Sequence, residues 1–238
     1  GELRYLSVRT WIAMGETARD RKDDKLTKEL MTRLRADVDE TESEIGGYWG
    51  YRCRLLLAMA EQSAKFGPEL ALVIRKAQAA YSNGRTQDAL RDYAAAFSLA
   101  RKQQRTDLAM QLGWRRASIE LDAKLFNAAA IDFLSLAERF PADALVPEAL
   151  YRAGESLYNS SQFEQALGVY LDVVERFPVS EQARKALYSA SWTYMDMDQK
   201  QASIASMERL VASYPESGYA RYAQFSIGDY YYSNKEYE

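Results

Sequence analysis

Histidine is absent from this chain of 238 residues, and cysteine occurs once, at Cys53. Without histidine the chain lacks the commonest general base and metal ligand at neutral pH. A lone thiol cannot form an internal disulfide, a Cys–His catalytic pair or a cysteine-rich zinc site. We therefore expect these residues to carry no catalytic site, no metal and no cofactor.

Long apolar runs and a strong charge of one sign are also missing. No segment reaches the roughly 18 apolar residues that a membrane-spanning helix needs. Residues 1–66 carry 12 basic and 12 acidic side chains, the remainder carries 19 and 22, and the formal net charge is −3. Neither part is basic enough to bind nucleic acid by neutralising phosphates. We predict neither a membrane span nor a nucleic-acid partner.

Two local patterns resemble ligand-binding motifs but lack residues that these motifs require. The acidic residues from Asp37 to Glu44 lack the glycine and the ligand spacing of a calcium loop, so we interpret them as a solvated helix end or loop. The segment from Gly46 to Gly50 has neither the spacing nor the lysine of a phosphate-binding loop. We interpret it as a break between helices.

What the chain does contain is a repeat with a period of 37 residues. An aromatic residue followed by proline occurs three times at that spacing, in Phe140-Pro141, Phe177-Pro178 and Tyr214-Pro215. Proline cannot continue a helix and restricts the residue before it, so each dipeptide marks a helix end. Three residues after each aromatic stands a good helix N-cap: Asp143, Ser180 and Ser217.

Between these helix ends the apolar residues recur at helical spacing. The segment from Pro147 to Phe177 predicts two amphipathic helices. The first carries Leu150, Ala153, Gly154 and Leu157, and the second carries Phe163, Ala166, Tyr170 and Val173. The composition, with 47% apolar residues and only 5 prolines, agrees with an all-helical chain.

This pattern resembles the tetratricopeptide repeat family, in which small residues stand where paired helices cross. Gly154 and Ala166 match its small positions, and the large or terminating positions are matched by Leu150, Leu157, Phe163, Tyr170 and Pro178. The resemblance implies an all-α fold, a right-handed superhelical solenoid of antiparallel helix pairs. Working backwards from these matches, earlier units fit if the turn around Gln103 to Thr106 is slightly longer.

The resemblance divides the chain into two parts. Residues 67–238 are expected to hold four to five repeat units, the last one truncated, because Gly228, Tyr231 and Tyr237 take the places of Gly154, Leu157 and Phe163. We therefore expect further repeats of a longer chain to pack against this end. Residues 1–66 predict three helices, near 3–14, 26–38 and 48–65, which we interpret as divergent repeats of the same solenoid. A separate helical domain is the alternative.

In tetratricopeptide folds the first helix of each pair lines a concave groove. The resemblance places two apolar rows there, one of Ile74, Trp114, Tyr151, Tyr188 and Phe225, the other of Tyr81, Leu121, Tyr158, Met195 and Tyr232. Between them lie Gln78, Ser118, Glu155, Trp192 and Asp229. Aromatic anchors flanked by polar groups are typical of surfaces that bind a peptide or protein segment. The candidate binding residues are Trp114, Tyr151, Glu155, Tyr158, Tyr188, Trp192, Met195, Phe225, Asp229 and Tyr232.

The resulting functional hypothesis is a non-enzymatic scaffold that binds a peptide or protein in this groove. One alternative is a structural spacer whose surfaces contact its own further repeats or another copy, and another is the regulatory arm of a larger enzyme. The cadence of Tyr214-Pro215 and the residues after it is similar to bacterial envelope members, among them the coordinator of the Tol-Pal system and the lipoprotein of the β-barrel assembly machine. That similarity implies a periplasmic or envelope location, with a cytoplasmic adaptor as the rival.

Overall fold

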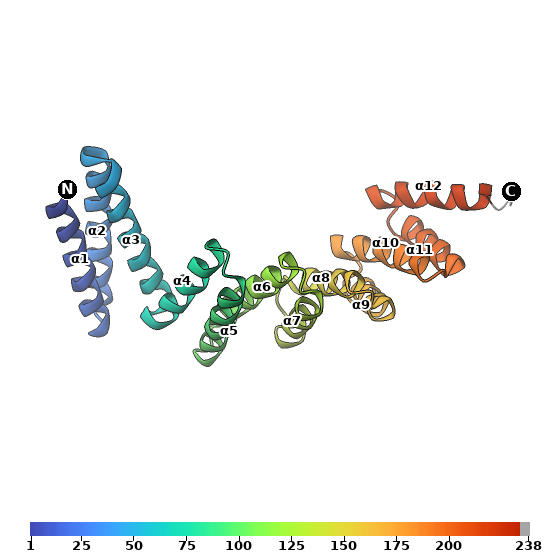
Figure 1. Cartoon of the computed structure of the whole chain (residues 1–238), viewed down its shortest axis with the longest axis horizontal. Helices are drawn as coiled ribbons and strands as arrows, with labels where there is room; N and C mark the ends of the chain where they lie inside the picture. The colour runs from blue at the N-terminus through green and yellow to red at the C-terminus, as the bar shows by residue number, and fades with distance from the viewer. Residues whose placement is uncertain (234–238) are drawn as a thin grey trace. The chain divides into compact units, whose positions relative to one another are not determined.

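The computed structural model describes residues 1–233, which form twelve α-helices and no strand. The expected all-helical fold class is confirmed. The helices are α1 (Glu2–Asp20), α2 (Asp24–Ile45), α3 (Gly47–Phe66), α4 (Pro68–Ser82), α5 (Thr86–Lys102), α6 (Thr106–Asp122), α7 (Phe126–Arg139), α8 (Val146–Asn159), α9 (Phe163–Arg176), α10 (Glu181–Asp196), α11 (Lys200–Ser213) and α12 (Gly218–Ser233), as labelled in Figure 1.

The chain divides into two compact units, Gly1–Lys76 and Ala77–Glu238. The boundary falls inside α4, whereas the sequence suggests the break at Gly67-Pro68. The predicted organisation, with divergent repeats in residues 1–66 and four to five units in residues 67–238, stays a prediction. One residue used for the truncated last unit, Tyr237, lies outside the described residues.

Unit 1 contains α1, α2 and α3, each packed against the other two, and the first part of α4. Its core includes Val8, Leu34 and Cys53, all with no exposed area. The three helices predicted in residues 1–66 are confirmed. Asp23 caps α2 by accepting a hydrogen bond from the Leu26 N–H at 2.9 Å. Gly46, with φ of +54°, separates α2 from α3 as expected, because glycine tolerates this conformation.

The acidic run lies in the second half of α2 and connects it to its neighbours. Asp37 accepts hydrogen bonds from Ser7 Oγ and Trp11 Nε1, both at 2.8 Å. Arg4 donates to both carboxylate oxygens of Glu40, at 2.7 and 2.8 Å. The run therefore stabilises the packing of α1 on α2, and is more than the solvated helix end that the sequence suggests.

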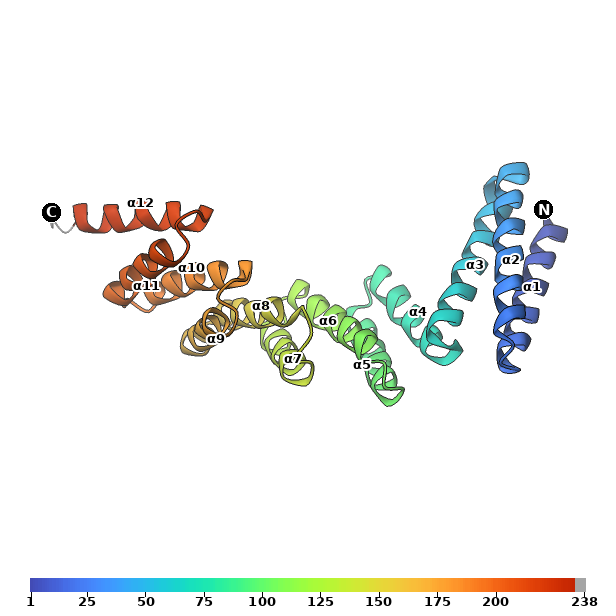
Figure 2. The ribbon, with the colours of Figure 1, turned by 180° about the vertical axis from the view of Figure 1, so that it is seen from behind.

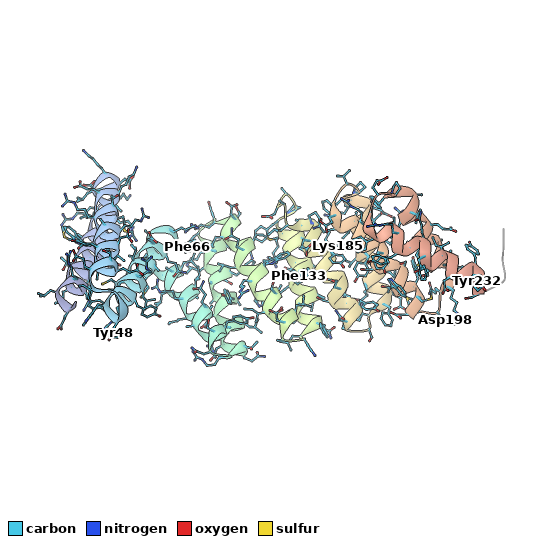
Figure 3. The ribbon with its side chains drawn as sticks, turned by 90° about the horizontal axis from the view of Figure 1, so that it is seen from above. Tyr48, Phe66, Phe133, Lys185, Asp198 and Tyr232 are labelled. Carbon is cyan, nitrogen blue, oxygen red and sulfur yellow. The ribbon has the colours of Figure 1, made fainter. Side chains whose placement is uncertain are left out.

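Unit 2 is a stack of antiparallel helices, as the predicted solenoid requires. Each helix from α5 to α11 packs against the next one along the chain, and α10 also contacts α8 and α12. In Figures 1 and 2, α6, α8 and α10 lie along one edge of this unit and α5, α7 and α9 along the other. Phe133, labelled in Figure 3, and Tyr170 are among the largest fully buried side chains.

The aromatic-proline dipeptides end helices as predicted. The N–H groups of Phe140, Phe177 and Tyr214 donate the last helical hydrogen bonds of α7, α9 and α11. Beyond them, Ser180 caps α10 by accepting from the Ala183 N–H at 3.1 Å. Ser217 precedes α12 and accepts from the Tyr219 N–H at 3.2 Å.

The N-cap prediction for Asp143 is wrong. Its Oδ1 accepts from the Leu145 N–H at 2.8 Å, and α8 begins only at Val146, after Leu145 in the cap position. Pro147 lies in the first turn of α8. Proline lacks the N–H that a first turn leaves unpaired, so it favours a helix start at this point.

A second type of turn recurs where no proline stands. Gln104, Lys124, Ser161 and Asp198 all have φ between +57° and +61° and follow α5, α6, α8 and α10. In each case two N–H groups bond back to the preceding helix, as Lys124 does to Leu121 and Leu125 to Glu120. This is the Schellman arrangement. The turn between Lys102 and Thr106 is of this short kind, so the expected longer turn there is wrong. The extra residues lie in α5 and α6, which have 17 residues each, against 14 in α7, α8 and α9.

The small positions allow paired helices to approach closely. A Cβ added to Gly154 on α8 would lie 2.5 Å from the ring of Tyr170 on α9. A Cβ on Gly113 of α6 would lie 2.6 Å from Leu136 on α7. Because Tyr170 is buried, its ring has little room to move, and Gly154 is required at this crossing.

Replacing Gly154 by alanine should therefore destabilise unit 2. Overpacking of a buried site typically costs about 1–3 kcal/mol, which exceeds the gain of up to about 1 kcal/mol from the better helix former. The matched control is Gly168→Ala in α9, where an added Cβ meets nothing within 4 Å and where we expect a small gain. Urea unfolding of both variants measures the difference. Equal stabilisation by the two changes would contradict the close approach.

Candidate functional site

A cavity of about 260 Å³ opens between α8, α9 and α10. The lining side chains follow from helical spacing, since Glu155 and Tyr158 are one turn apart on α8, and Tyr188 and Trp192 one turn apart on α10. We call it the first cavity; the residues lining it are Glu155, Tyr158, Asn159, Tyr170, Tyr188, Ser189 and Trp192.

Ring contacts and one hydrogen bond hold the aromatic walls of the first cavity. Tyr188 and Trp192 meet edge to face with ring centroids 6.2 Å apart, and Tyr188 also packs on Tyr219 of α12 at 5.4 Å. The Tyr158 hydroxyl donates to Asp196 Oδ2. This bond and, to a smaller extent, burial raise the pKa of Tyr158. The walls of the first cavity are therefore preformed by contacts between neighbouring helices.

Glu155 brings a carboxylate to the first cavity. Arg152 Nη1 donates to Glu155 at 3.2 Å, while Arg152 Nε donates to Glu148 at 2.9 Å. One guanidinium therefore serves two carboxylates, and this cluster keeps a net negative charge. Burial raises the pKa of Glu155 above its ordinary value.

A second cavity of about 420 Å³ lies between α10, α11 and α12. Trp192 borders both cavities and so forms a wall that they share. The second cavity is lined by Trp192, Met195, Lys200, Ile204, Met207, Phe225, Ser226, Asp229, Tyr230 and Ser233. We call the two cavities together the aromatic groove.

The structure brings seven of the ten candidate residues to the aromatic groove. They are Glu155, Tyr158, Tyr188, Trp192, Met195, Phe225 and Asp229. The exposed fraction of Trp192 is 42% and that of Phe225 is 78%, which leaves both rings open to a partner.

The other three candidates do not line either cavity. Trp114 packs edge to face on Phe133, with centroids 5.2 Å apart. Tyr151 packs on Tyr170 at 5.9 Å and shares a hydrogen bond of 3.4 Å with Ser189 Oγ. Burial raises the pKa of Tyr151 to about 12. Tyr232 is 70% exposed on α12. Trp114 and Tyr151 therefore serve the packing of the helices.

Sequence reasoning missed lining residues that come from the second helix of each pair. Tyr170 on α9 closes the first cavity, and Ile204 and Met207 on α11 line the second. The sequence places Tyr170 in the apolar stripe and at a large position of the family, not in the groove. The sequence signal for it is Gly154. Because glycine has no side chain, the ring of Tyr170 can occupy the crossing point and also border the cavity.

Two of the helix pairs that line the groove match a known family. The sequence model of the tetratricopeptide repeat matches residues 148–180 and 185–217, which span α8 with α9 and most of α10 with α11. These two segments are tetratricopeptide repeats. No curated protein sequence matches the chain.

Two solved structures of MamA agree on the fold. MamA from Desulfovibrio magneticus RS-1, from its residue 41 to the end, is 13% identical, with 79% of this chain and 97% of that chain covered and a TM-score of 0.51. A MamA RS-1 double mutant is also 13% identical, with 77% and 93% covered and a TM-score of 0.50. YrrB, described as a TPR protein with an unusual peptide-binding site, is 16% identical, with 89% and 97% covered and a TM-score of 0.47.

Residues 1–233 show neither a metal site nor a membrane-spanning helix. No group of three or more acidic or cysteine side chains there is arranged to hold a metal ion. None of the described helices has the length and apolarity that crossing a membrane requires.

A buried charged cluster lies in the helix pair just before the matched tetratricopeptide repeats. Arg116 on α6 contacts Glu120 and, on α7, Asp132, both at 3.2 Å. Glu120 is 3% exposed, and its Oε2 has no hydrogen-bond partner in the described structure. Burial and then the neighbouring Asp132 charge raise the pKa of Glu120 to about 7. A protonated Glu120 can donate a hydrogen bond to Asp132.

This cluster predicts a pH dependence of stability. The folded state binds a proton on Glu120 more tightly than the unfolded chain does. The contribution of Glu120 to the free energy of unfolding therefore falls as pH rises from about 4.5 to above 7. The loss should be on the order of 1–3 kcal/mol. Glu120→Gln should remove this pH dependence. Glu138 is an exposed acid on α7, and Glu138→Gln should leave the pH dependence unchanged. Urea unfolding at pH 5 and pH 8.5 measures both. The same pH dependence in the two variants would contradict the assignment.

Proposed function

We propose that this chain is a non-enzymatic docking module that binds a segment of another protein in the aromatic groove. The observation that carries the proposal is the pair of neighbouring cavities that share Trp192 as a common wall. Each cavity can take one side chain of a bound segment, so together the cavities contact two side chains of a partner.

The chemistry of the groove supports this proposal. Trp and Tyr are the residues that most often carry the energy of protein interfaces, where a ring meets a partner in a desolvated pocket. Trp192 and Phe225 are exposed although water disfavours large apolar rings, which is typical of interaction surfaces. Polar groups at the edge, such as Ser189 and Asp229, can pair with a partner backbone.

Rigidity of the walls also supports it. The groove lies on helices, and the rings of Tyr158 and Tyr188 are already held by Asp196 and Tyr219. A preformed site loses less conformational entropy when a partner binds.

The proposal predicts that Trp192→Ala combined with Phe225→Ala strongly weakens partner binding while the fold is kept. Both rings are exposed, so their removal leaves the buried core intact. Selection from a random peptide display library on the unchanged protein should yield binders that lose at least about tenfold in affinity with the double variant. Circular dichroism and thermal unfolding check the fold.

The control variant is Tyr51→Ala, which removes a 68% exposed ring from α3 in unit 1. It should bind every selected peptide as the unchanged protein does. Peptides that bind the double variant equally well would contradict a groove function, and so would a failure to select any binder.

Self-association through α12 is a second candidate. Tyr222, Phe225 and Tyr232 on this helix are 66%, 78% and 70% exposed, which gives it an unusually apolar exposed surface. This candidate predicts a molar mass that rises with concentration in sedimentation equilibrium and returns to the monomer in Tyr222→Ala plus Phe225→Ala. A constant monomer mass would exclude it.

A further inference from the structure

The first cavity has the composition of a cage for a cation. Rings of Tyr158, Tyr170, Tyr188 and Trp192 line it, supplied by α8, α9 and α10. The face of an aromatic ring carries partial negative charge and attracts Lys or Arg side chains, most strongly when the site is desolvated. A purely apolar guest would use the area of these rings but not their electrostatic character.

A negative charge faces the same space. Glu155 is the one charged side chain among the described residues that line the first cavity. Its partner Arg152 is shared with Glu148. Lys185 also interacts with Glu148 but is itself paired with Glu181, so two positive charges stand against three negative ones. Asp196 lies beside the rim, where it accepts the hydrogen bond of Tyr158. An incoming cation would complete the neutralisation of this cluster, whereas an anion would meet uncompensated carboxylates.

The second cavity differs in character. Met195, Ile204, Met207 and Phe225 supply apolar walls, and its two charged residues, Lys200 and Asp229, have opposite signs. This cavity therefore favours an apolar side chain. Packed helices lie about 8–10 Å apart, which an extended chain covers in about three residues at roughly 3.3 Å each.

We propose that the aromatic groove binds a polypeptide segment that places an arginine or lysine side chain in the first cavity and an apolar side chain, about three residues away, in the second. This inference rests on the docking function proposed above and specifies the chemistry of the bound segment. The cationic side chain stacks against Tyr188 and Trp192 and approaches Glu155, while the shared wall at Trp192 sets the spacing between the two anchors.

The indole N–H of Trp192 reports directly on both cavities. The chain has four tryptophans, so a ¹H–¹⁵N spectrum of the whole protein shows four indole signals at most, and Trp192→Phe identifies the relevant one. The probes are N-acetyl-arginine amide and its uncharged analogue N-acetyl-citrulline amide. The arginine compound should shift the Trp192 signal with an affinity about tenfold above that of the citrulline compound. The signals of Trp11, Trp49 and Trp114 should not move.

Matched variants test each part of the cage. Glu155→Gln should remove the preference for arginine over citrulline, while Glu164→Gln, an exposed acid on α9, should keep it. A peptide with arginine, two glycines and leucine should bind at least about tenfold more tightly than the arginine compound, and Phe225→Ala should remove that gain.

The outcomes separate this inference from the proposed function. Equal shifts by arginine and citrulline, or a preference that survives Glu155→Gln, would overturn the cation cage. If display selection still yields groove-dependent peptides without a basic residue, the docking function stands and only the cage is wrong. If the arginine amide binds but the leucine-containing peptide binds no better, the site takes a free cation and the polypeptide segment is wrong.

Discussion

The close approach of α8 and α9 at Gly154 is the constraint on which the groove depends. Because Gly154 has no side chain, the ring of Tyr170 can fill the crossing point and remain buried. The same ring forms one wall of the first cavity and packs against Tyr151. A contact that stabilises the repeat thus also determines the shape of its candidate binding site. Stability and the shape of the first cavity cannot be changed independently at this position.

Much of the fold could be predicted from the sequence because its signals are local. Proline after an aromatic ends α7, α9 and α11 whatever the surroundings, and the apolar stripes follow from helical period. The Schellman turns could not be predicted, since Lys124, Ser161 and Asp198 adopt the left-handed conformation that usually indicates glycine. Their helices hold them there by paired hydrogen bonds. Asp143 was assigned to the wrong role because Pro147 decides where α8 begins.

The sequence places the candidate residues on the first helix of each pair, but it does not give how deeply each side chain lies. Helical period places Tyr151 and Tyr158 on one side of α8, two turns apart, and says nothing about what covers each. The structure places Tyr151 against Tyr170 and Ser189, while Tyr158 borders a cavity. Contributions from α11, such as Ile204, depend on how closely two helices pack, which a single-helix pattern cannot give.

Trp192 links the two cavities of the groove. Since its indole bounds both cavities, a change of its side-chain rotamer would enlarge one cavity at the expense of the other. In the proposed binding, occupation of the two cavities would then be coupled through one set of torsion angles and not through a movement of helices. Two side chains that suit the same rotamer would bind cooperatively, and two that require different rotamers would compete.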